Sequence, residues 1–350
     1  MKWEENVRKV VPYIPGEQPK RKDIVKLNTN ENPYPPAPGV AKLLEEFNLD
    51  TLRLYPDPDT SELTQELANY YGVKPSQVFV GVGSDDVLAM AFLTFFNAKE
   101  PILFPDITYS FYDVWADLYR IPYKVCPLDE DFTIKASDYT QPNGGVIFPN
   151  PNAPTGVYAP LELVEEIIKA NQDVVVVVDE AYIDFGGASC IPLLEKYENL
   201  LVVQTFSKSR SMAGMRIGFA IGNEKLIGYL NDAKFSFNSY TMNRPAQCLG
   251  VEAVRDDVYF RDCNAKIIAT RERVKAALTE LGFTFPDSMA NFIFAKHESV
   301  SGEEIFKALK DRGIFVRHWN KPRIENYLRI SIGTDEQMDK MLAALKEILA

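Results

Sequence analysis

Segments with apolar residues at helical spacing alternate along the chain with short continuous apolar runs, which are typical of buried strands. Apolar residues at helical spacing predict a helix over Ser61–Tyr71, which Gly72 would end, and another over Leu161–Ala170, which Pro160 would open. Val174–Val178 is a run of five valines, typical of a strand buried on both faces of a parallel sheet. The pattern therefore predicts a fold in which helices and strands alternate.

Short apolar runs predict three further strands, over Val78–Val80, Leu200–Val203 and Ile217–Ile221. After the first of them, Ser84 is expected to cap a helix. Together with the helices, these strands predict a large α/β/α sandwich domain with a mostly parallel sheet over residues 45–245.

The two ends of the chain have different patterns. Residues 12–38 are rich in proline and asparagine, which predicts an extended arm, and residues 1–44 as a whole are expected to join a smaller domain. Residues 246–350 are predicted to form that smaller α+β domain, whose final helix begins at Thr334 with Gln337 completing a capping box. Its strands are expected at Asn291–Ala295, Ile314–Val316 and Tyr327–Ile332, and its final helix carries the apolar stripe Met338, Met341, Leu342 and Leu345.

Composition excludes several classes of protein. The chain has 350 residues, with 38 lysines and arginines against 49 aspartates and glutamates, and therefore a net charge of −11. Hydrophobic residues make up 46% and charged residues 25%, which is an ordinary globular composition and not that of a disordered chain. Because an acidic protein lacks the basic surface that phosphate backbones require, no nucleic-acid partner is expected.

Cysteine and histidine are too scattered to predict a metal site, since the four cysteines form no C-x-x-C pair and the two histidines are far apart. Thiols without a disulfide framework suit a reducing compartment, so a cytoplasmic protein is expected. The charged amino terminus shows no apolar signal region, and the most apolar stretch, Val87–Phe96, is too short to cross a bilayer. No membrane partner is therefore expected.

The segment Gly81–Asp86 follows a predicted strand and opens a predicted helix, so its backbone N–H groups could hold a phosphate. It begins like a dinucleotide-binding fingerprint, but Asp86 stands where the third glycine belongs, which disfavours a nicotinamide dehydrogenase. Taken alone, the segment could also be an ordinary tight turn.

Two further segments place reactive side chains at the ends of predicted strands. Asp179 and Tyr182 follow the five valines, where open α/β sheets bind ligands, although solvated loop residues would give the same pattern. Lys208, which lies among small hydroxyl residues after Leu200–Val203, suits a Schiff base or a phosphate contact, although most lysines are simply exposed. Arg216 leads into an apolar strand and is expected to have an anionic partner.

In this order along the chain, the segments resemble those of the fold type I pyridoxal-phosphate-dependent aminotransferases, and more narrowly the histidinol-phosphate aminotransferases among them. The resemblance runs nearly from end to end. The lysine segment and Pro154-Thr155-Gly156 are specific to the superfamily, while the amino-terminal Asn-Glu-Asn-Pro and Tyr-Pro pieces narrow it. The matching segments are Pro12–Gly16, Leu27–Pro33, Arg53–Pro56, Gly81–Asp86, Asn150–Gly156, Asp179–Tyr182, Thr205–Gly218 and Tyr327–Thr334.

The resemblance implies catalytic roles for three residues. Lys208 would form a Schiff base with pyridoxal 5′-phosphate and later act as the base that moves a substrate proton. Asp179 would pair with the ring nitrogen and keep it protonated, so that the ring can act as an electron sink. Tyr182 would hydrogen bond the phenolic oxygen of the ring, and Tyr109 would stack on the ring.

The resemblance also implies how the cofactor phosphate and the substrate are held. Tyr55 would reach the phosphate from the other subunit of a homodimer with shared active sites. Arg329 would bind the carboxylate of the amino-acid partner as a bidentate fork, and Tyr13 and Asn32 would contact the substrate. The phosphate-binding residues within the subunit would be Gly83, Ser84, Asp85, Ser207 and Arg216.

The chain departs from the family pattern at one position. The family commonly has an asparagine immediately before Pro-Thr-Gly, bonded to the phenolic oxygen, whereas this chain has Ala153 there and Asn152 one position earlier. Either Asn152 supplies that bond as a further cofactor-binding residue, or Tyr182 acts alone. We expect the bond from Asn152, with an ordinary turn residue as the alternative.

The implied activity is transamination between histidinol phosphate and imidazole acetol phosphate, with glutamate and 2-oxoglutarate as the other pair, in histidine biosynthesis. An aromatic amino-acid aminotransferase or a threonine-phosphate decarboxylase would share the cofactor residues, so both stay open. A non-catalytic binding protein of the same fold would be expected to have lost Lys208 or Asp179, and both are present. A Ser-His-Asp hydrolase is disfavoured because the chain has no G-x-S-x-G segment.

Overall fold

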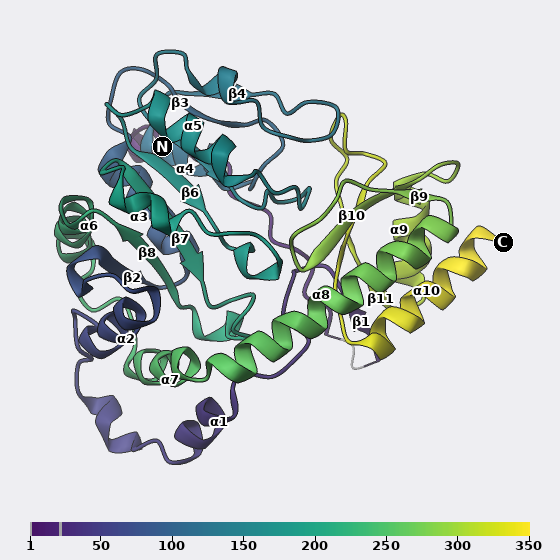
Figure 1. The fold of residues 1–350 in the computed structure, drawn as a ribbon, viewed down its shortest axis with the longest axis horizontal. Helices are drawn as coiled ribbons and strands as arrows, with labels where there is room; N and C mark the ends of the chain where they lie inside the picture. The colour runs from purple at the N-terminus through teal and green to yellow at the C-terminus, as the bar shows by residue number, and fades with distance from the viewer. Residues whose placement is uncertain (1, 21–22) are drawn as a thin grey trace.

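A computed structural model describes residues 2–20 and 23–350 of the chain. Residues 1, 21 and 22 lie outside the described residues, and so do the predictions that fall on Met1 and on that part of the arm. Figure 1 shows a larger group of elements around one sheet and a smaller group around a second sheet. The long helix α8 (Asp257–Glu280) runs between the two groups (Figure 1).

The order of elements alternates between strand and helix through the middle of the chain, as the periodicity predicts. The other helices are α1 (Pro38–Glu45), α2 (Ser61–Tyr71), α3 (Ser84–Phe95), α4 (Tyr112–Tyr119), α5 (Leu161–Ala170), α6 (Glu224–Phe237), α7 (Arg244–Arg255), α9 (Gly302–Asp311) and α10 (Asp335–Leu349). The strands are β1 (Val25–Lys26), β2 (Val78–Gly81), β3 (Ile102–Pro105), β4 (Tyr123–Cys126), β5 (Val146–Pro149), β6 (Val176–Asp179), β7 (Leu200–Thr205), β8 (Gly218–Gly222), β9 (Phe283–Thr284), β10 (Phe292–His297), β11 (Ile314–Phe315), β12 (Arg317–His318) and β13 (Leu328–Ser331).

The large sheet contains seven strands from the described part of the chain, in the order β2-β8-β7-β6-β5-β3-β4. Strands β7, β6, β5, β3 and β4 run parallel, whereas β8 is antiparallel to both of its neighbours. Pro149 of β5 lies beside Asp179 of β6, which lies beside Val203 of β7. The prediction of a mostly parallel sheet is therefore confirmed.

Helices cover both faces of this sheet and make it an α/β/α sandwich. Val176 and Val178 of β6 pack with residues of α2, α5 and α7, while Val177 packs with residues of α3, α4 and α6. Successive strand residues point to opposite faces, so a continuous run of valines supplies both cores. Each of these side chains is fully buried and contributes about 1.5–3 kcal/mol of transfer free energy.

Two local predictions are wrong. Strand β6 begins at Val176 and not at Val174, because the N–H of Val174 donates to the carbonyl of Asn171 in the turn after α5. Ser84 does not cap α3, because Gly83 occupies the cap position and Ser84 is the first helical residue. Gly83 has a φ of 87°, a left-handed conformation that glycine adopts without the steric cost that serine would have.

The smaller group is built on an antiparallel sheet in the order β12-β13-β10-β9, packed against α8, α9 and α10. Strand β1 of the amino-terminal arm pairs in parallel with β11, which ties the arm to this group. The predicted capping box at the start of α10 is present, and the predicted apolar stripe of that helix is buried. The carboxyl-terminal prediction is confirmed in both respects.

The predicted domain boundaries after residues 44 and 245 stay predictions. Apolar residues of both α1 and α7 belong to the cluster that packs on one face of the large sheet. Apolar residues of α8, α9 and α10 belong instead to the cluster of the small sheet.

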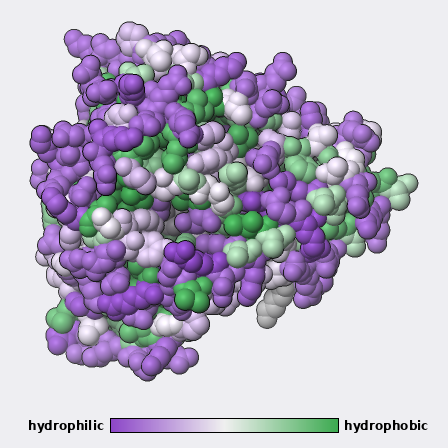
Figure 2. All heavy atoms as spheres, in the orientation of Figure 1, coloured by the Kyte–Doolittle hydropathy of each residue, from purple (hydrophilic) through white to green (hydrophobic). Residues whose placement is uncertain are grey.

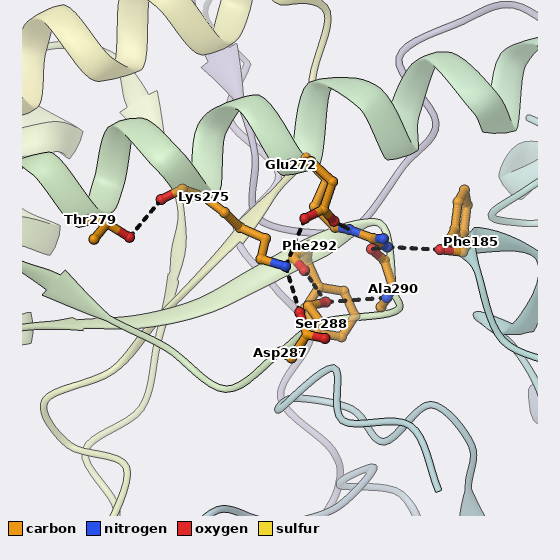
Figure 3. A network of polar contacts seen from close by, with 9 residues as sticks. Phe185, Glu272, Lys275, Thr279, Asp287, Ser288, Ala290 and Phe292 are labelled. Carbon is orange, nitrogen blue, oxygen red and sulfur yellow. Dashed lines mark hydrogen bonds and ion pairs between the residues drawn. The ribbon is translucent and has the colours of Figure 1, made fainter. Parts of the chain in front are cut away.

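Hydrogen bonds and ion pairs connect the loop before β10 to helix α8 (Figure 3). Lys275 donates to Asp287 at 2.5 Å in this loop. The buried guanidinium of Arg271 donates to the carbonyls of Ala290 and Phe185, at 3.0 and 2.8 Å. Phe185 belongs to the turn after β6, so α8 also holds a turn that carries a predicted site residue.

The surface is mostly hydrophilic on the face shown in Figure 2, where hydrophobic residues form scattered patches. Among the described residues, no helix combines the length and the apolar character that crossing a membrane requires.

Candidate active site

The predicted site residues follow the carboxyl ends of neighbouring strands. Tyr109 comes after β3, Asn152 after β5, Asp179 ends β6, and Lys208 comes after β7. Because parallel strands end at the same edge of a sheet, these side chains lie close together. Strand β2 runs in the same direction as β7, with β8 antiparallel between them, and therefore brings Gly83 to this edge as well.

A cavity of about 460 Å³, called the central cavity below, opens at this edge. It gathers most of the predicted site residues together with further residues that were not predicted, among them Thr29, Glu31 and Ala181. The predicted residues that line it are Tyr13, Ser84, Asp85, Tyr109, Asp179, Tyr182, Ser207, Lys208 and Arg216.

Lys208 projects from the loop after β7 and is partly exposed in the central cavity. Its ammonium group donates to the carbonyl of Thr29 on the arm at 3.0 Å. The same group lies 5.7 Å from the ring centre of Tyr182. A flexible side chain held by one neutral acceptor can turn toward a bound molecule with little loss of hydrogen bonding.

Asp179 is a buried carboxylate at the end of β6. Burial raises its pKa to about 7, against the lowering effect of its hydrogen bonds. Those bonds come from the hydroxyl of Tyr112 at 3.0 Å and from the backbone N–H of Ala181 at 3.2 Å. A carboxyl group with such a pKa readily ionises when a cationic partner approaches it.

Tyr182 lies on the turn after β6 and is buried except where it meets the cavity. Its hydroxyl accepts a hydrogen bond of 3.0 Å from the side-chain amide of Asn30. The rings of Phe292 and Tyr182 are nearly perpendicular, with centres 5.1 Å apart. The tyrosine is therefore held from the arm on one side and from the small sheet on the other.

The start of α3 and the arginine that precedes β8 form the positive end of the cavity. The guanidinium of Arg216 donates to Asp85 at 3.2 Å and, more weakly, to Ser207 at 3.4 Å. Asp85 also accepts a 2.7 Å hydrogen bond from Tyr109. A Cβ on Gly83 would lie 2.5 Å from the guanidinium of Arg216 and would displace it, and the positive φ of Gly83 also favours glycine at this position.

The structure does not bring Asn152 to the cavity surface. Its amide donates to the carbonyl of Ile107 at 3.0 Å and to the hydroxyl of Thr155 at 2.9 Å. Ala153 lines the central cavity instead. The amide of Asn152 therefore stabilises the turn, and its part in cofactor binding stays a prediction.

A second cavity of about 330 Å³, called the adjacent cavity, shares Tyr13 and Tyr109 with the central one. Arg317 and Arg329 line it, both from the small sheet. Arg329 donates to the carbonyl of Asn28 at 3.0 Å, and its buried Nε has no partner among the described residues. Burial lowers the pKa of Arg329. Unused arginine donors in a cavity suit an anionic ligand.

Tyr13 lines both cavities and also stacks on Phe111, with ring centres 4.1 Å apart. Asn32 lies beneath the lysine loop and donates to the carbonyls of Lys208 and Ser209, at 3.0 and 3.2 Å. Tyr55 lines neither the central nor the adjacent cavity and is 78% exposed.

Sequence reasoning missed the partners of the predicted residues. Tyr112 binds Asp179, Asn30 binds Tyr182, and the carbonyl of Thr29 accepts from Lys208. The only sequence signal was that these residues fall within or beside segments already singled out. Their pairing depends on the fold, since the contacts span between 67 and 179 positions of the chain.

The central cavity fits a phosphorylated pyridine ring. It offers a buried carboxyl group for a ring nitrogen, a lysine for an aldehyde, and the glycine cradle beside Arg216 for a phosphate. An α/β sandwich with this set at one edge of its sheet defines a pyridoxal-phosphate enzyme of fold type I. The comparisons with known proteins agree.

The chain belongs to the class I and II aminotransferases, whose family model matches residues 22–345. It is 52% identical over 349 residues to the histidinol-phosphate aminotransferase of Lactococcus lactis subsp. cremoris (strain MG1363), covering 100% of this chain and 98% of the relative. The enzyme of the same name from Clostridium botulinum (strain Kyoto / Type A2) is 51% identical over 347 residues, covering 99% and 98%.

Solved structures show the same fold. The histidinol-phosphate aminotransferase of Sinorhizobium meliloti in complex with pyridoxal 5′-phosphate has a TM-score of 0.85 at 24% identity, covering 93% of this chain and 90% of that chain. The enzyme from Clostridium acetobutylicum has a TM-score of 0.85 at 24% identity, covering 93% and 98%. The resemblance is therefore confirmed: the protein is an aminotransferase, and pyridoxal 5′-phosphate is its cofactor.

Proposed function

We propose that the protein interconverts histidinol phosphate and imidazole acetol phosphate, with glutamate and 2-oxoglutarate as the other pair, in histidine biosynthesis. The names of its full-length relatives support this substrate. The observation that carries the proposal is the pair of adjoining cavities, one with Lys208 and Asp179 and the other with Arg317 and Arg329. A phosphate monoester and a dicarboxylate are both anions, so the same arginines can serve both half-reactions.

Bound pyridoxal phosphate supplies an electron sink for the substrate carbanion. In the proposed assignment, Lys208 holds the cofactor covalently and then moves the substrate proton as a base. Asp179 ionises beside the ring nitrogen and keeps a proton on it, and its burial makes that charge pairing strong. Tyr182 donates to the phenolic oxygen, and Tyr109 packs against the ring.

The cofactor phosphate is assigned to the positive end of the central cavity. Arg216, the hydroxyl of Ser207 and the N–H groups at the start of α3 point to this assignment. Its backbone donors are proposed to come from Gly83, Ser84 and Asp85. The substrate is assigned to the adjacent cavity, with Arg329 as its carboxylate fork and Tyr13 at its edge.

We propose a homodimer with shared active sites. Tyr55 is exposed and packs on Tyr240, with ring centres 4.7 Å apart. Leu52, Leu54 and Phe237 are also exposed, with 55%, 50% and 72% of their surface accessible. Several large apolar residues exposed on neighbouring segments favour a protein interface. A partner seated there could receive the hydroxyl of Tyr55 at its cofactor phosphate.

We place the enzyme in the cytoplasm. All four cysteines are free thiols, and three of them are buried, which suits a reducing compartment.

The test is to mix the purified, cofactor-loaded protein with histidinol phosphate and to follow the absorption of the bound cofactor. We expect conversion of the pyridoxal form to the pyridoxamine form, and its reversal by 2-oxoglutarate. Lys208→Ala is the matched control and is expected to show no conversion. Conversion by phenylalanine or tyrosine but not by histidinol phosphate would favour an aromatic aminotransferase, and release of carbon dioxide from threonine phosphate would favour the decarboxylase.

A further inference from the structure

Asn30 is a fully buried residue of the arm, only 1% exposed, that links the small sheet to Tyr182. Its φ is 57°, a left-handed conformation that asparagine and aspartate tolerate better than most residues. Its carbonyl accepts a hydrogen bond from the side chain of Asn291 at 3.0 Å. The backbone of Asn30 is therefore held in place independently of the contacts that its side chain makes.

Ser331 of β13 fixes which end of the Asn30 amide faces Tyr182. The hydroxyl of Ser331 accepts from the backbone N–H of Asn30 at 2.9 Å. Its single hydrogen is then donated to the side-chain oxygen of Asn30 at 2.8 Å. The oxygen of the amide is thereby occupied, and the NH₂ group is the end that meets the Tyr182 hydroxyl at 3.0 Å.

A phenolic hydroxyl that accepts from an amide still has one hydrogen to donate. Among the described residues, the Tyr182 hydroxyl has no hydrogen-bonding partner other than Asn30. Because Tyr182 lines the central cavity, that hydrogen is free to point into it. The chain has Ala153 at the cavity surface and keeps the amide of Asn152 on other partners, so neither of these residues offers a competing donor.

We propose that Asn30 is a positioning residue, which by donating to the Tyr182 hydroxyl aims the hydrogen of that hydroxyl at the phenolic oxygen of the cofactor. The inference rests on the proposed role of Tyr182. A donor at the phenolic oxygen stabilises the more negatively charged form of the bound cofactor. It therefore lowers the pKa of the bound cofactor, which is followed by the change of its absorption with pH. Loss or reversal of the donor raises that pKa.

The test is Asn30→Asp, measured as the pH titration of the absorption of the bound cofactor. Aspartate keeps the shape of the side chain and tolerates the left-handed backbone. An ionised carboxylate only accepts, so it would take the hydrogen of Tyr182 out of the cavity. We expect the titration midpoint to rise by about one to two pH units, the worth of one charge-assisted hydrogen bond.

Tyr182→Phe and the double variant separate this effect from the added charge. Tyr182→Phe is expected to raise the midpoint by a similar amount. In the Tyr182→Phe background, Asn30→Asp adds the same charge but has no hydroxyl to redirect. The rise of the midpoint that Asn30→Asp causes in this background is therefore expected to be about one pH unit or more smaller than the rise that it causes in the parent protein. An equal rise with and without the tyrosine hydroxyl would mean that charge alone is responsible, and would overturn the positioning role.

Ser331→Ala is the second variant, and it changes only the group that fixes the amide of Asn30. It leaves Asn30 and Tyr182 in place, so it stays informative if buried aspartate prevents folding. We expect a rise of the midpoint in the same direction, and an unchanged midpoint would contradict the inference. If Tyr182→Phe itself leaves the midpoint unchanged, the proposed role of Tyr182 fails. If only Asn30→Asp and Ser331→Ala leave it unchanged, the role of Tyr182 stands and that of Asn30 fails.

Discussion

Replacing Asp179 by asparagine should have opposite effects on the protein with and without its cofactor. In the cofactor-free protein, burial raises the pKa of Asp179 to about 7, while its ordinary value is 3.8. The folded state therefore holds a proton between those pH values that the unfolded state has released. The contribution of Asp179 to the free energy of unfolding then falls as the pH rises from about 4 to about 7, and it stays lower above pH 7.

The gap between the two pKa values corresponds to about 4 kcal/mol of unfolding free energy, of which about 2 kcal/mol falls between pH 5 and pH 7. Asparagine carries no charge, and its amide can still accept from Tyr112 or donate to it. The free energy of unfolding of Asp179→Asn, relative to the parent protein, should therefore rise by about 2 kcal/mol across this interval.

Urea unfolding of the cofactor-free protein at several pH values measures this difference. Asp173→Asn is the matched control, because Asp173 is exposed just before the same strand. The change of the Asp179→Asn difference with pH is compared with that of this control. A difference for Asp179→Asn that is flat, or that falls with rising pH, would refute the reasoning. In the loaded enzyme, the same variant should lose at least about 10²-fold in turnover, since a neutral amide cannot hold the ring proton by charge.

Four further expectations follow from the same contacts. Lys208→Ala should abolish covalent attachment of the cofactor, and borohydride reduction with peptide mapping of the parent protein should label Lys208 alone. Tyr112→Phe should lower the unfolding free energy of the cofactor-free protein by about 1.5–3 kcal/mol at pH 8 and by less at pH 6, where Asp179 is protonated; equal losses at both pH values, measured by urea unfolding, would contradict this. Arg329→Lys should lower kcat/KM about 10²-fold for histidinol phosphate and for glutamate alike, and a loss confined to one substrate would show that the fork is not shared. Tyr55→Phe should weaken cofactor affinity ten- to a hundredfold, and isolated heterodimers of Tyr55→Phe with Lys208→Ala should keep one site of parental affinity if the sites are shared.

Long periodic segments could be predicted from the sequence because their signals are local. The bounds of α5 agree at both ends, and α10 has the predicted capping box. The direction of β8 could not be predicted, because an apolar run looks the same in a parallel and in an antiparallel strand. The prediction of Ser84 as the cap of α3 is wrong because the decisive property is the left-handed backbone of Gly83, which composition does not reveal.

The residues of the candidate site likewise include some that local sequence signals could predict and others that they could not. Lys208, Asp179 and Tyr182 could be predicted because each follows a recognisable strand, and the sheet edge brings such residues together. Tyr112 could not, because its importance lies in a hydrogen bond to a carboxylate 67 positions away. The amide of Asn152 binds within the turn that carries it and the loop beside it, and its part in cofactor binding stays a prediction.

The amino-terminal arm has almost no regular structure, and its hydrogen bonds explain why it contains several asparagines. Three of its residues contact the reactive loops: Thr29 and Asn32 bind the side chain and the backbone of Lys208, and Asn30 binds Tyr182. A buried extended chain lacks the internal hydrogen bonds of a helix or a sheet, so its polar groups need partners elsewhere. Asparagine has both a donor and an acceptor on a short side chain. It can therefore form hydrogen bonds both within such a segment and with a neighbouring element. The same chemistry that satisfies the polar groups of the buried residues Asn28 and Asn30 also fixes the lysine and the tyrosine in place.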